Sequence, residues 1–328
     1  MKLSYILAAI LSLLAPIICG YAIFNIHLGM VGALGGLALM NEVYDNPVKK
    51  QIALNLACAI LFGTASFMVG MALAGNTLFS LAMLPVVILI VSAIGEINRL
   101  LIKNAARFIV FFIIGYHTAV AANVYSILSI AFFAGALWTA IVLLTIKTLV
   151  KNSEAPAEIT KTYTVKQYLD HWKKSLSKFH GWQFPLRITI CMVIAQIIRY
   201  FFPDNHSYWI LLTIAIVTQH NIDNQIARIR NRGLGTLLGV LISFIFVYFT
   251  LPVYAIIIFI GILASARVIF RETNYLLYAA VMTPLIIILL DFGELSSVSI
   301  LVERLAATVI GCVISYIFGY LIWSKGYL

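Results

Sequence analysis

A short pattern that combines an arginine, a threonine and a glycine occurs twice in the second half of the chain. In each copy the threonine follows the arginine by four residues and the glycine follows it by seven: Arg232, Thr236 and Gly239, then Arg304, Thr308 and Gly311. The guanidinium group of arginine is planar, stays charged and binds a carboxylate through two hydrogen bonds. A threonine hydroxyl one helical turn further on adds another donor. The two arginines and two threonines are therefore candidate substrate-binding residues for an organic anion.

Aromatic and titratable residues extend this candidate site. Tyr208 and Trp209 are possible ring partners for an aromatic substrate, or else residues of the aromatic belt at the membrane interface. Glu303 and His206 are the proton-coupling candidates, because carboxyl and imidazole groups can exchange protons near a transport path. The structural alternative for Glu303 is that it neutralises a neighbouring arginine.

Three glycines predict close helix packing. Gly235 and Gly239 are four residues apart, and this spacing lets a neighbouring helix approach closely in a membrane. Gly311 ends the second copy of the pattern. We expect all three glycines to face other helices.

The sequence lacks the patterns of an enzyme or of a metal site. HExxH, GxSxG and Walker A patterns are absent. The four cysteines stand singly inside apolar runs, without CxxC or Cys/His spacing, and are expected to be small packing residues. We therefore expect no enzyme activity, no cofactor and no metal ion.

The composition defines the class of protein that must position these residues. Of 328 residues, 62% are apolar and 10% are charged, whereas a soluble domain is about 45–50% apolar and about a quarter charged. The apolar runs are long and continuous, which excludes the short alternating strands of a β-barrel. The sequence predicts an all-α polytopic membrane protein in contact with the lipid bilayer.

The apolar runs between charged residues predict about twelve transmembrane helices. They cover 3–23, 27–41, 50–74, 77–95, 104–121 and 124–149 in the first half, and 184–202, 207–219, 233–251, 252–268, 274–290 and 297–323 in the second. The expected organisation is a first, diverged six-helix repeat over 1–149, a connector over 150–183 and a second six-helix repeat over 184–328.

The basic residues predict the orientation in the membrane. With the N-terminus inside, every one of the 22 Lys and Arg residues except Arg199 and Arg304 falls on the cytoplasmic side. The protein is therefore expected in a bacterial inner membrane with both termini in the cytoplasm. The net charge of +10 is explained by this topology, and we expect no nucleic-acid partner.

The connector 150–183 combines an apolar, aromatic helical face with lysines placed largely off that face. This pattern is typical of a helix that lies at the inner membrane interface. A binding site for anionic lipid or for a partner protein is the alternative.

Internal repetition is indicated at two levels. The second span of each half is unusual, since 27–41 is rich in glycine and 207–219 is short, and such spans at matching positions are typical of a transporter's binding site. Two half-helices that merely pack closely are the alternative. The recurring arginine pattern lies on two helices of opposite predicted direction, which suggests inverted three-helix units within a half.

From residue 185 to about 325 the chain resembles the fusaric-acid-resistance family, also called aromatic acid exporters. The residues that carry the resemblance are Arg187, the run Tyr208-Trp209-Ile210-Leu211-Leu212-Thr213, Arg232 with Gly235-Thr236-x2-Gly239, and Arg304-x3-Thr308-x2-Gly311. The family implies inner-membrane efflux proteins built of six-helix repeats. The chain also resembles, more distantly, the plant aluminium-activated malate transporters, which are anion channels.

The chain departs from the family pattern in two respects. Many family members carry a large cytoplasmic domain where this chain has only 150–183. In the first half, Asn55 stands roughly where Arg232 stands in the second, so the arginine is not duplicated.

The function predicted is an inner-membrane exporter of small organic acids, aromatic carboxylates among them, driven by protons. The alternatives are an organic-anion channel and a structural or regulatory membrane subunit that transports nothing. The expected partners are lipid and a small organic anion; a homo-oligomer or a periplasmic partner is left open.

Overall fold

The computed structural model describes residues 2–40, 49–74, 77–121, 125–149, 165–202, 206–249, 251–294 and 297–324. These residues are helical with short connections, and they contain no strand. The helices of the first half are α1 (Lys2–Ala22), α2 (Ile26–Leu39), α3 (Lys49–Leu73), α4 (Thr77–Gly95), α5 (Arg99–Ala121) and α6 (Tyr125–Leu149). The prediction of an all-α protein is confirmed.

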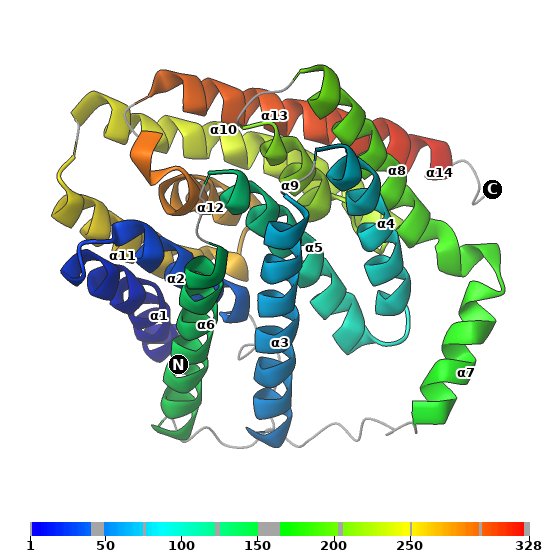
Figure 1. The fold of residues 1–328 in the computed structure, drawn as a ribbon, viewed down its shortest axis with the longest axis horizontal. Helices are drawn as coiled ribbons and strands as arrows, with labels where there is room; N and C mark the ends of the chain where they lie inside the picture. Colours follow the sequence, from blue (N-terminus) through cyan, green and yellow to red (C-terminus); the bar gives the residue numbers. More distant parts are fainter. Residues whose placement is uncertain are drawn as a thin grey trace. The chain divides into compact units, whose positions relative to one another are not determined.

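The second half continues in the same way (Figure 1). Its elements are α7 (Val165–Leu176), α8 (Phe179–Phe201), α9 (Tyr208–Val217), the 3-10 turn η1 (Ile222–Asn224), α10 (Gln225–Phe249), α11 (Val253–Arg271), α12 (Tyr275–Leu290), the 3-10 turn η2 (Phe292–Glu294), α13 (Val298–Tyr316), the π-helical turn η3 (Ile317–Leu321) and α14 (Ile322–Ser324).

Within the described residues, eight helices are long and apolar enough to cross a membrane. They are α1, α3, α5, α6, α8, α10, α11 and α13 with its continuation to Ser324. Four shorter apolar helices, within α2, α4, α9 and α12, account for the other predicted spans. A membrane protein with many apolar helices is therefore confirmed, and the number of twelve crossings stays a prediction.

Three helices begin earlier than the apolar runs predict. α5 begins at Arg99 because Asn98 precedes it and accepts a hydrogen bond from the backbone N–H of Leu101 at 2.8 Å. α8 begins at Phe179, inside the predicted connector, and the indole of Trp182 donates to the Leu176 carbonyl at 2.8 Å. α10 begins at Gln225, so Arg232 lies about two turns inside a helix rather than at its start.

The predicted amphipathic helix of the connector is present as α7, which packs against α8. Its Trp172 indole donates a hydrogen bond to the Ala93 carbonyl at the end of α4, at 2.8 Å. Lys166, Lys173 and Lys174 are exposed. The part of the connector at 150–164 lies outside the described residues.

The chain divides into two compact units, and each draws on both halves of the sequence. Unit 1 consists of 1–64, 124–155 and 231–306, and unit 2 consists of 65–123, 156–230 and 307–328. Unit 1 therefore contains α1, α2, α6, α11 and α12, and unit 2 contains α4, α5, α7, α8 and α9. α3, α10 and α13 each contribute one part to each unit.

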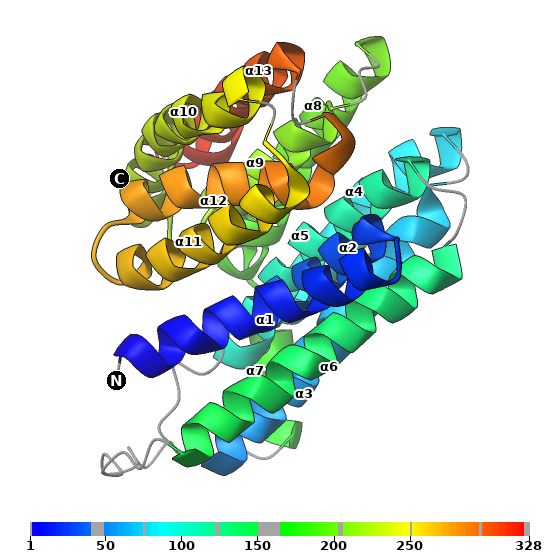
Figure 2. The same ribbon diagram turned by 90° about the vertical axis from the view of Figure 1, so that its left-hand side faces the viewer.

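Within unit 1, α2 packs against α1 and α6, and α1 also packs against α11 (Figure 2). The approach of α2 is close because glycines line it. A Cβ atom added at Gly35 would lie 2.0 Å from the Phe132 carbonyl oxygen, and one added at Gly29 would lie 2.7 Å from the Pro16 carbonyl oxygen. The glycines that predicted an unusual span thus allow backbone contact on two sides of this helix.

Within unit 2, α4 packs against α8 and α5, and α9 packs against α5 and α8. The C-terminal part of α3 lies close to α5, since a Cβ atom at Gly70 would lie 2.2 Å from the Phe112 carbonyl oxygen. Gly115 approaches α3 in return, with the Phe67 carbonyl oxygen at 2.3 Å from an added Cβ atom.

The two units contain corresponding internal contacts. In unit 1, α1 contacts α2 and α11, and α12 contacts α11 and α2; in unit 2, α8 contacts α9 and α4, and α5 contacts α4 and α9. Glycines of α6 and α13 mark the same correspondence, since Gly135 abuts Gly32 of α2 and Gly311 abuts Thr213 of α9. α3 and α10 both have 25 residues, and α4 and α11 both have 19.

Candidate functional site

Unit 2 contains a polar cavity of about 560 Å³. The ends of several elements meet there: the turn after α4, the ends of α7 and α8, the segment from α9 to η1, and the C-terminal turns η3 and α14. The lining residues are Glu96, Ser175, Gly181, Gln183, Phe184, Arg187, His220, Asn221, Ile222, Asp223, Tyr320 and Ser324. Ligand pockets of small molecules typically have volumes of about 300–1,000 Å³, so this cavity has the size of a small-molecule site.

The buried cation of the cavity is Arg187 in the third turn of α8, which is 2% exposed. Its Nε–H donates to the Gly319 carbonyl oxygen at 2.7 Å, and its Nη2 donates to the Gln225 side-chain oxygen. Gln225 in turn donates to the Ser315 carbonyl oxygen at 2.9 Å. Three elements therefore fix the plane of the guanidinium group, which limits the entropy lost when it binds a ligand.

The π-helical turn η3 supplies the carbonyl group at Gly319. A π-turn contains an extra residue, and such turns occur frequently at functional sites. A side chain at Gly319 would collide with Gln225, because an added Cβ atom would lie 2.8 Å from its Nε2 atom. Glycine at this position thus permits the hydrogen bonds that hold Arg187.

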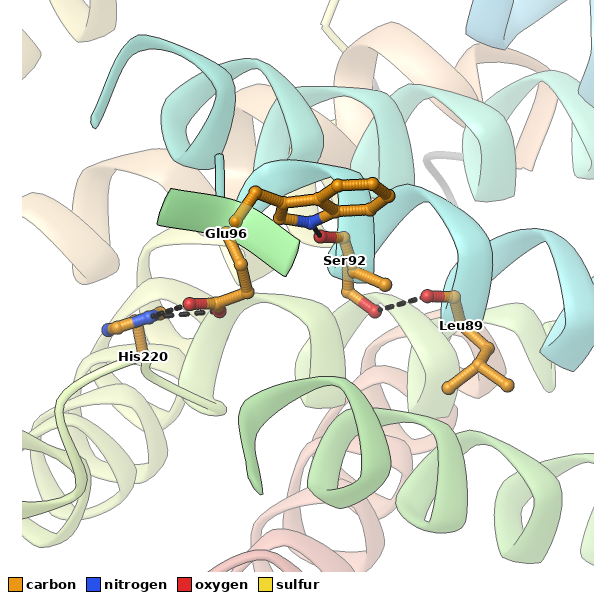
Figure 3. Close-up of polar contacts among 6 residues, drawn as sticks. Leu89, Ser92, Glu96 and His220 are labelled. Atoms are coloured by element: carbon orange, nitrogen blue, oxygen red, sulfur yellow. Dashed lines mark hydrogen bonds and ion pairs between the residues drawn. The ribbon is translucent and has the colours of Figure 1, made fainter. Parts of the chain in front are cut away.

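An ion pair between Glu96 and His220 lies at the same cavity (Figure 3). The Nε2 atom of His220 is 2.9 Å from one carboxylate oxygen of Glu96 and 3.0 Å from the other. The hydrogen bond to Glu96 raises the pKa of His220 above its ordinary value, while burial and the charge of Arg187 oppose this shift. The His220 side chain is 46% exposed and Glu96 is 12% exposed, so the histidine can exchange its proton with water.

The predicted substrate-binding residues that lie in unit 1 are buried. Arg232 is 3% exposed and Thr236 is 0% exposed, one turn apart on α10, and Arg304 on α13 is 0% exposed. The Nε atom of Arg232 and the hydroxyl of Thr236 have no hydrogen-bond partner among the described residues. Glu303 precedes Arg304 on α13 and is half-buried.

The two predicted packing glycines of α10 lie against α12. An added Cβ atom at Gly235 would be 2.6 Å from the Ala279 Cβ atom and 2.7 Å from the Leu276 carbonyl oxygen. One at Gly239 would be 2.5 Å from the Thr283 Cβ atom. The two helix backbones therefore approach closely along this line.

The other predicted residues lie in unit 2. Tyr208 and Trp209, at the start of α9, are 2% and 0% exposed, and Thr308 is 0% exposed. The Tyr208 ring stacks on His117 of α5 at a centroid distance of 3.5 Å, and the His206 ring is 6.4 Å away. The structure thus gathers one tyrosine and two histidines into an internal cluster.

The sequence analysis missed the pair Glu96–His220 and a fourth buried arginine, Arg267. Arg267 is 1% exposed, lies 3.3 Å from the Met40 sulfur and is 5.7 Å from the centroid of the Tyr278 ring. A repeated sequence signal marks Glu96: Glu96-Ile97-Asn98 precedes α5 as Glu272-Thr273-Asn274 precedes α12, and both asparagines accept hydrogen bonds from the next helix. No comparable signal marks Arg267.

The apolar helices define a polytopic helical membrane protein, and comparison with known proteins defines part of it further. Residues 190–318 match the family model described as "Fusaric acid resistance protein-like". This stretch, from α8 into η3, is similar to that family, as the sequence resemblance predicted, and the match supports a transport function. The more distant resemblance to malate transporters stays a prediction.

Two curated relatives match less than half of the chain. It is 30% identical over 139 residues to an uncharacterized protein of Haemophilus influenzae, and 28% identical over 137 residues to the uncharacterized protein YhfK of Escherichia coli K12. Each match covers 42% of this chain and 19% of the relative. The matched stretch therefore spans about a fifth of each relative. No solved structure matches the chain.

Proposed function

We propose that this protein exports small organic acids, aromatic carboxylates among them, across a bacterial inner membrane at the expense of the proton gradient. One observation carries the proposal. Among the described residues, four arginines are no more than 3% exposed, namely Arg187, Arg232, Arg267 and Arg304, whereas the most buried carboxylate, Asp291, is 7% exposed.

An excess of buried positive charge is costly in an apolar helical protein. Charged residues in membrane-spanning helices cost several kcal/mol and are typical of substrate pathways. An organic anion in transit would offset that charge while it binds, and arginine is suited to carboxylates because its donors match both oxygens. Arg232 with Thr236, and Arg304 with Thr308, are the proposed substrate-binding residues, with Tyr208 and Trp209 as the ring partners.

The proposed architecture is a pair of six-helix repeats with both termini in the cytoplasm. The corresponding contacts inside the two units and the equal lengths of α3 and α10 support the repeat. The charge distribution along the sequence supports the orientation. Glu303 and His206 are the proposed proton-coupling residues.

The test is flux of weak aromatic acids from proteoliposomes that contain the purified protein. We expect efflux of labelled benzoate that saturates with concentration and is accelerated by an imposed pH gradient. A current that reverses with the anion gradient and shows no saturation would favour an anion channel instead. If no acid of the panel is transported by protein that is folded and correctly inserted, the proposal is wrong.

A further inference from the structure

The cavity around Arg187 is distinct from the arginine patterns of α10 and α13, and its charges suggest a separate role. We propose that this cavity binds a small carboxylate at Arg187 and that the pair His220–Glu96 controls this binding by taking up or releasing one proton. This proposal takes only the class of ligand, a small carboxylate, from the proposed function. The cavity lies on the side that the charge distribution predicts to be cytoplasmic.

Arg187 has the properties of an anchoring residue. Its side chain is almost fully buried, and bonds to Gly319 and Gln225 hold the guanidinium plane in place before a ligand arrives. Phe184, one turn before Arg187 on α8, and Tyr320 of η3 give the same cavity two ring surfaces. A volume of about 560 Å³ accommodates a one-ring carboxylic acid with water around it.

The charge of the cavity depends on His220. The charged and titratable groups that line the cavity with it are Glu96 from the turn after α4, Arg187 from α8, Asp223 from η1 and Tyr320 from η3. When His220 is protonated it compensates Glu96, and among these lining groups Asp223 alone opposes the charge of Arg187. When His220 loses its proton, Glu96 and Asp223 both oppose the charge of Arg187. Carboxylate binding therefore weakens as the pH rises.

The ion pair is placed to respond to cytoplasmic pH. It joins the turn between α4 and α5 to the segment between α9 and η1, both outside the candidate membrane spans. Because the hydrogen bond to Glu96 raises the pKa of His220, this histidine keeps its proton to a higher pH than an ordinary histidine does. Acid that accumulates in the cytoplasm would thus load the cavity with carboxylate, and removal of the acid would unload it.

The test is equilibrium binding of benzoate to the purified full-length protein in detergent, with benzamide as the neutral analogue. For the wild-type protein we expect benzoate affinity to fall about tenfold between about pH 5.5 and about pH 8.5, as expected when one nearby charge becomes uncompensated. Benzamide binding should not change with pH. Benzoate affinity that is independent of pH in the wild-type protein would overturn the proposal.

Two substitutions in the connecting segments decide the mechanism without altering α8. His220→Gln should bind benzoate about as weakly at acidic pH as the wild type does at alkaline pH, whereas Glu96→Gln should bind tightly at both. Matched controls are His27→Gln, an exposed histidine of unit 1, and Glu272→Gln, the glutamate of the corresponding turn in unit 1. If benzoate binding by His220→Gln still depends on pH as in the wild type, His220 does not regulate the binding.

Arg187→Gln tests the anchor, and Arg199→Gln on the same helix is its control. We expect Arg187→Gln to lose at least tenfold in benzoate affinity at acidic pH, and unchanged affinity in the folded variant would overturn the site. Binding is measured separately from flux. If the wild-type protein binds benzoate with the expected pH profile but transports no acid, the proposed exporter function is wrong. If the protein transports benzoate but the substitutions at Arg187, His220 and Glu96 leave benzoate binding unchanged, only the proposal for this cavity is wrong.

Discussion

The contact between α10 and α12 allows a quantitative prediction from two glycines of one helix. Gly239 faces α12, where an added Cβ atom would lie 2.5 Å from the Thr283 Cβ atom and 2.6 Å from the Ala280 carbonyl oxygen. Gly233, six residues earlier on α10, has no atom within 4 Å of an added Cβ atom. The substitution of alanine at each position therefore separates the effect of packing from the effect of helix propensity.

Gly239→Ala forces two backbones apart, because one of the colliding atoms is a backbone carbonyl oxygen. Overpacking of this kind costs about 1–3 kcal/mol. Gly233→Ala adds a methyl group in open space and gains about 0.5–1 kcal/mol of helix propensity. Gly239→Ala gains the same helix propensity, so this term cancels between the variants. We expect their free energies of unfolding to differ by the packing cost of about 1–3 kcal/mol, with Gly239→Ala the less stable.

The assay is reversible unfolding of each variant in mixed detergent, followed by the loss of helical circular dichroism. Thermal midpoints provide a second measurement, and a difference of several degrees between the variants is expected. Gly239→Leu should fail to give a monodisperse protein. If Gly239→Ala unfolds at the same point as Gly233→Ala, the close approach of α10 and α12 does not contribute to stability.

Three further predictions concern charge. Arg232→Lys should weaken benzoate flux because the planar donors are lost, and Arg232→Ala should abolish it. The control Arg230→Ala, at an exposed position of the same helix, should transport normally. Equal transport rates in all three variants would mean that Arg232 has a structural role only. Because the pKa of His220 is raised in the folded protein, its pairing with Glu96 stabilises the fold fully at pH values below the ordinary pKa of histidine. This stabilisation is lost as the pH rises through the raised pKa. His220→Gln should therefore lower the thermal midpoint at acidic pH and leave it nearly unchanged at alkaline pH. A reporter that works only in the cytoplasm should be active when it is fused to the C-terminus. Activity of a C-terminal reporter that works only in the periplasm would refute the predicted topology.

The sequence by itself determined the class of the protein and the approximate position of its helices, although α5, α8 and α10 begin five to eight residues earlier than the apolar runs predict. Apolar runs identify membrane helices because each helix satisfies its own backbone hydrogen bonds, so the pattern is local in sequence. The closely packed glycines of α2 and α10 could be predicted for a similar reason, since their spacing places them on one helical face. The resemblance over the second half was visible because its residues lie at short, recognisable intervals.

Only the tertiary structure decided how the polar side chains pair. Arg187 meets Gly319 across 132 residues and Gln225 across 38 residues, and Glu96 meets His220 across 124 residues. Such partners depend on which helix ends are brought together, and one sequence contains no periodic signal for that. Arg267 was missed for the same reason, because Met40, which supplies part of its environment, lies 227 residues away in the sequence. The local physics of a helix predicts its length and faces, whereas a binding cavity is formed by the ends of several helices at once.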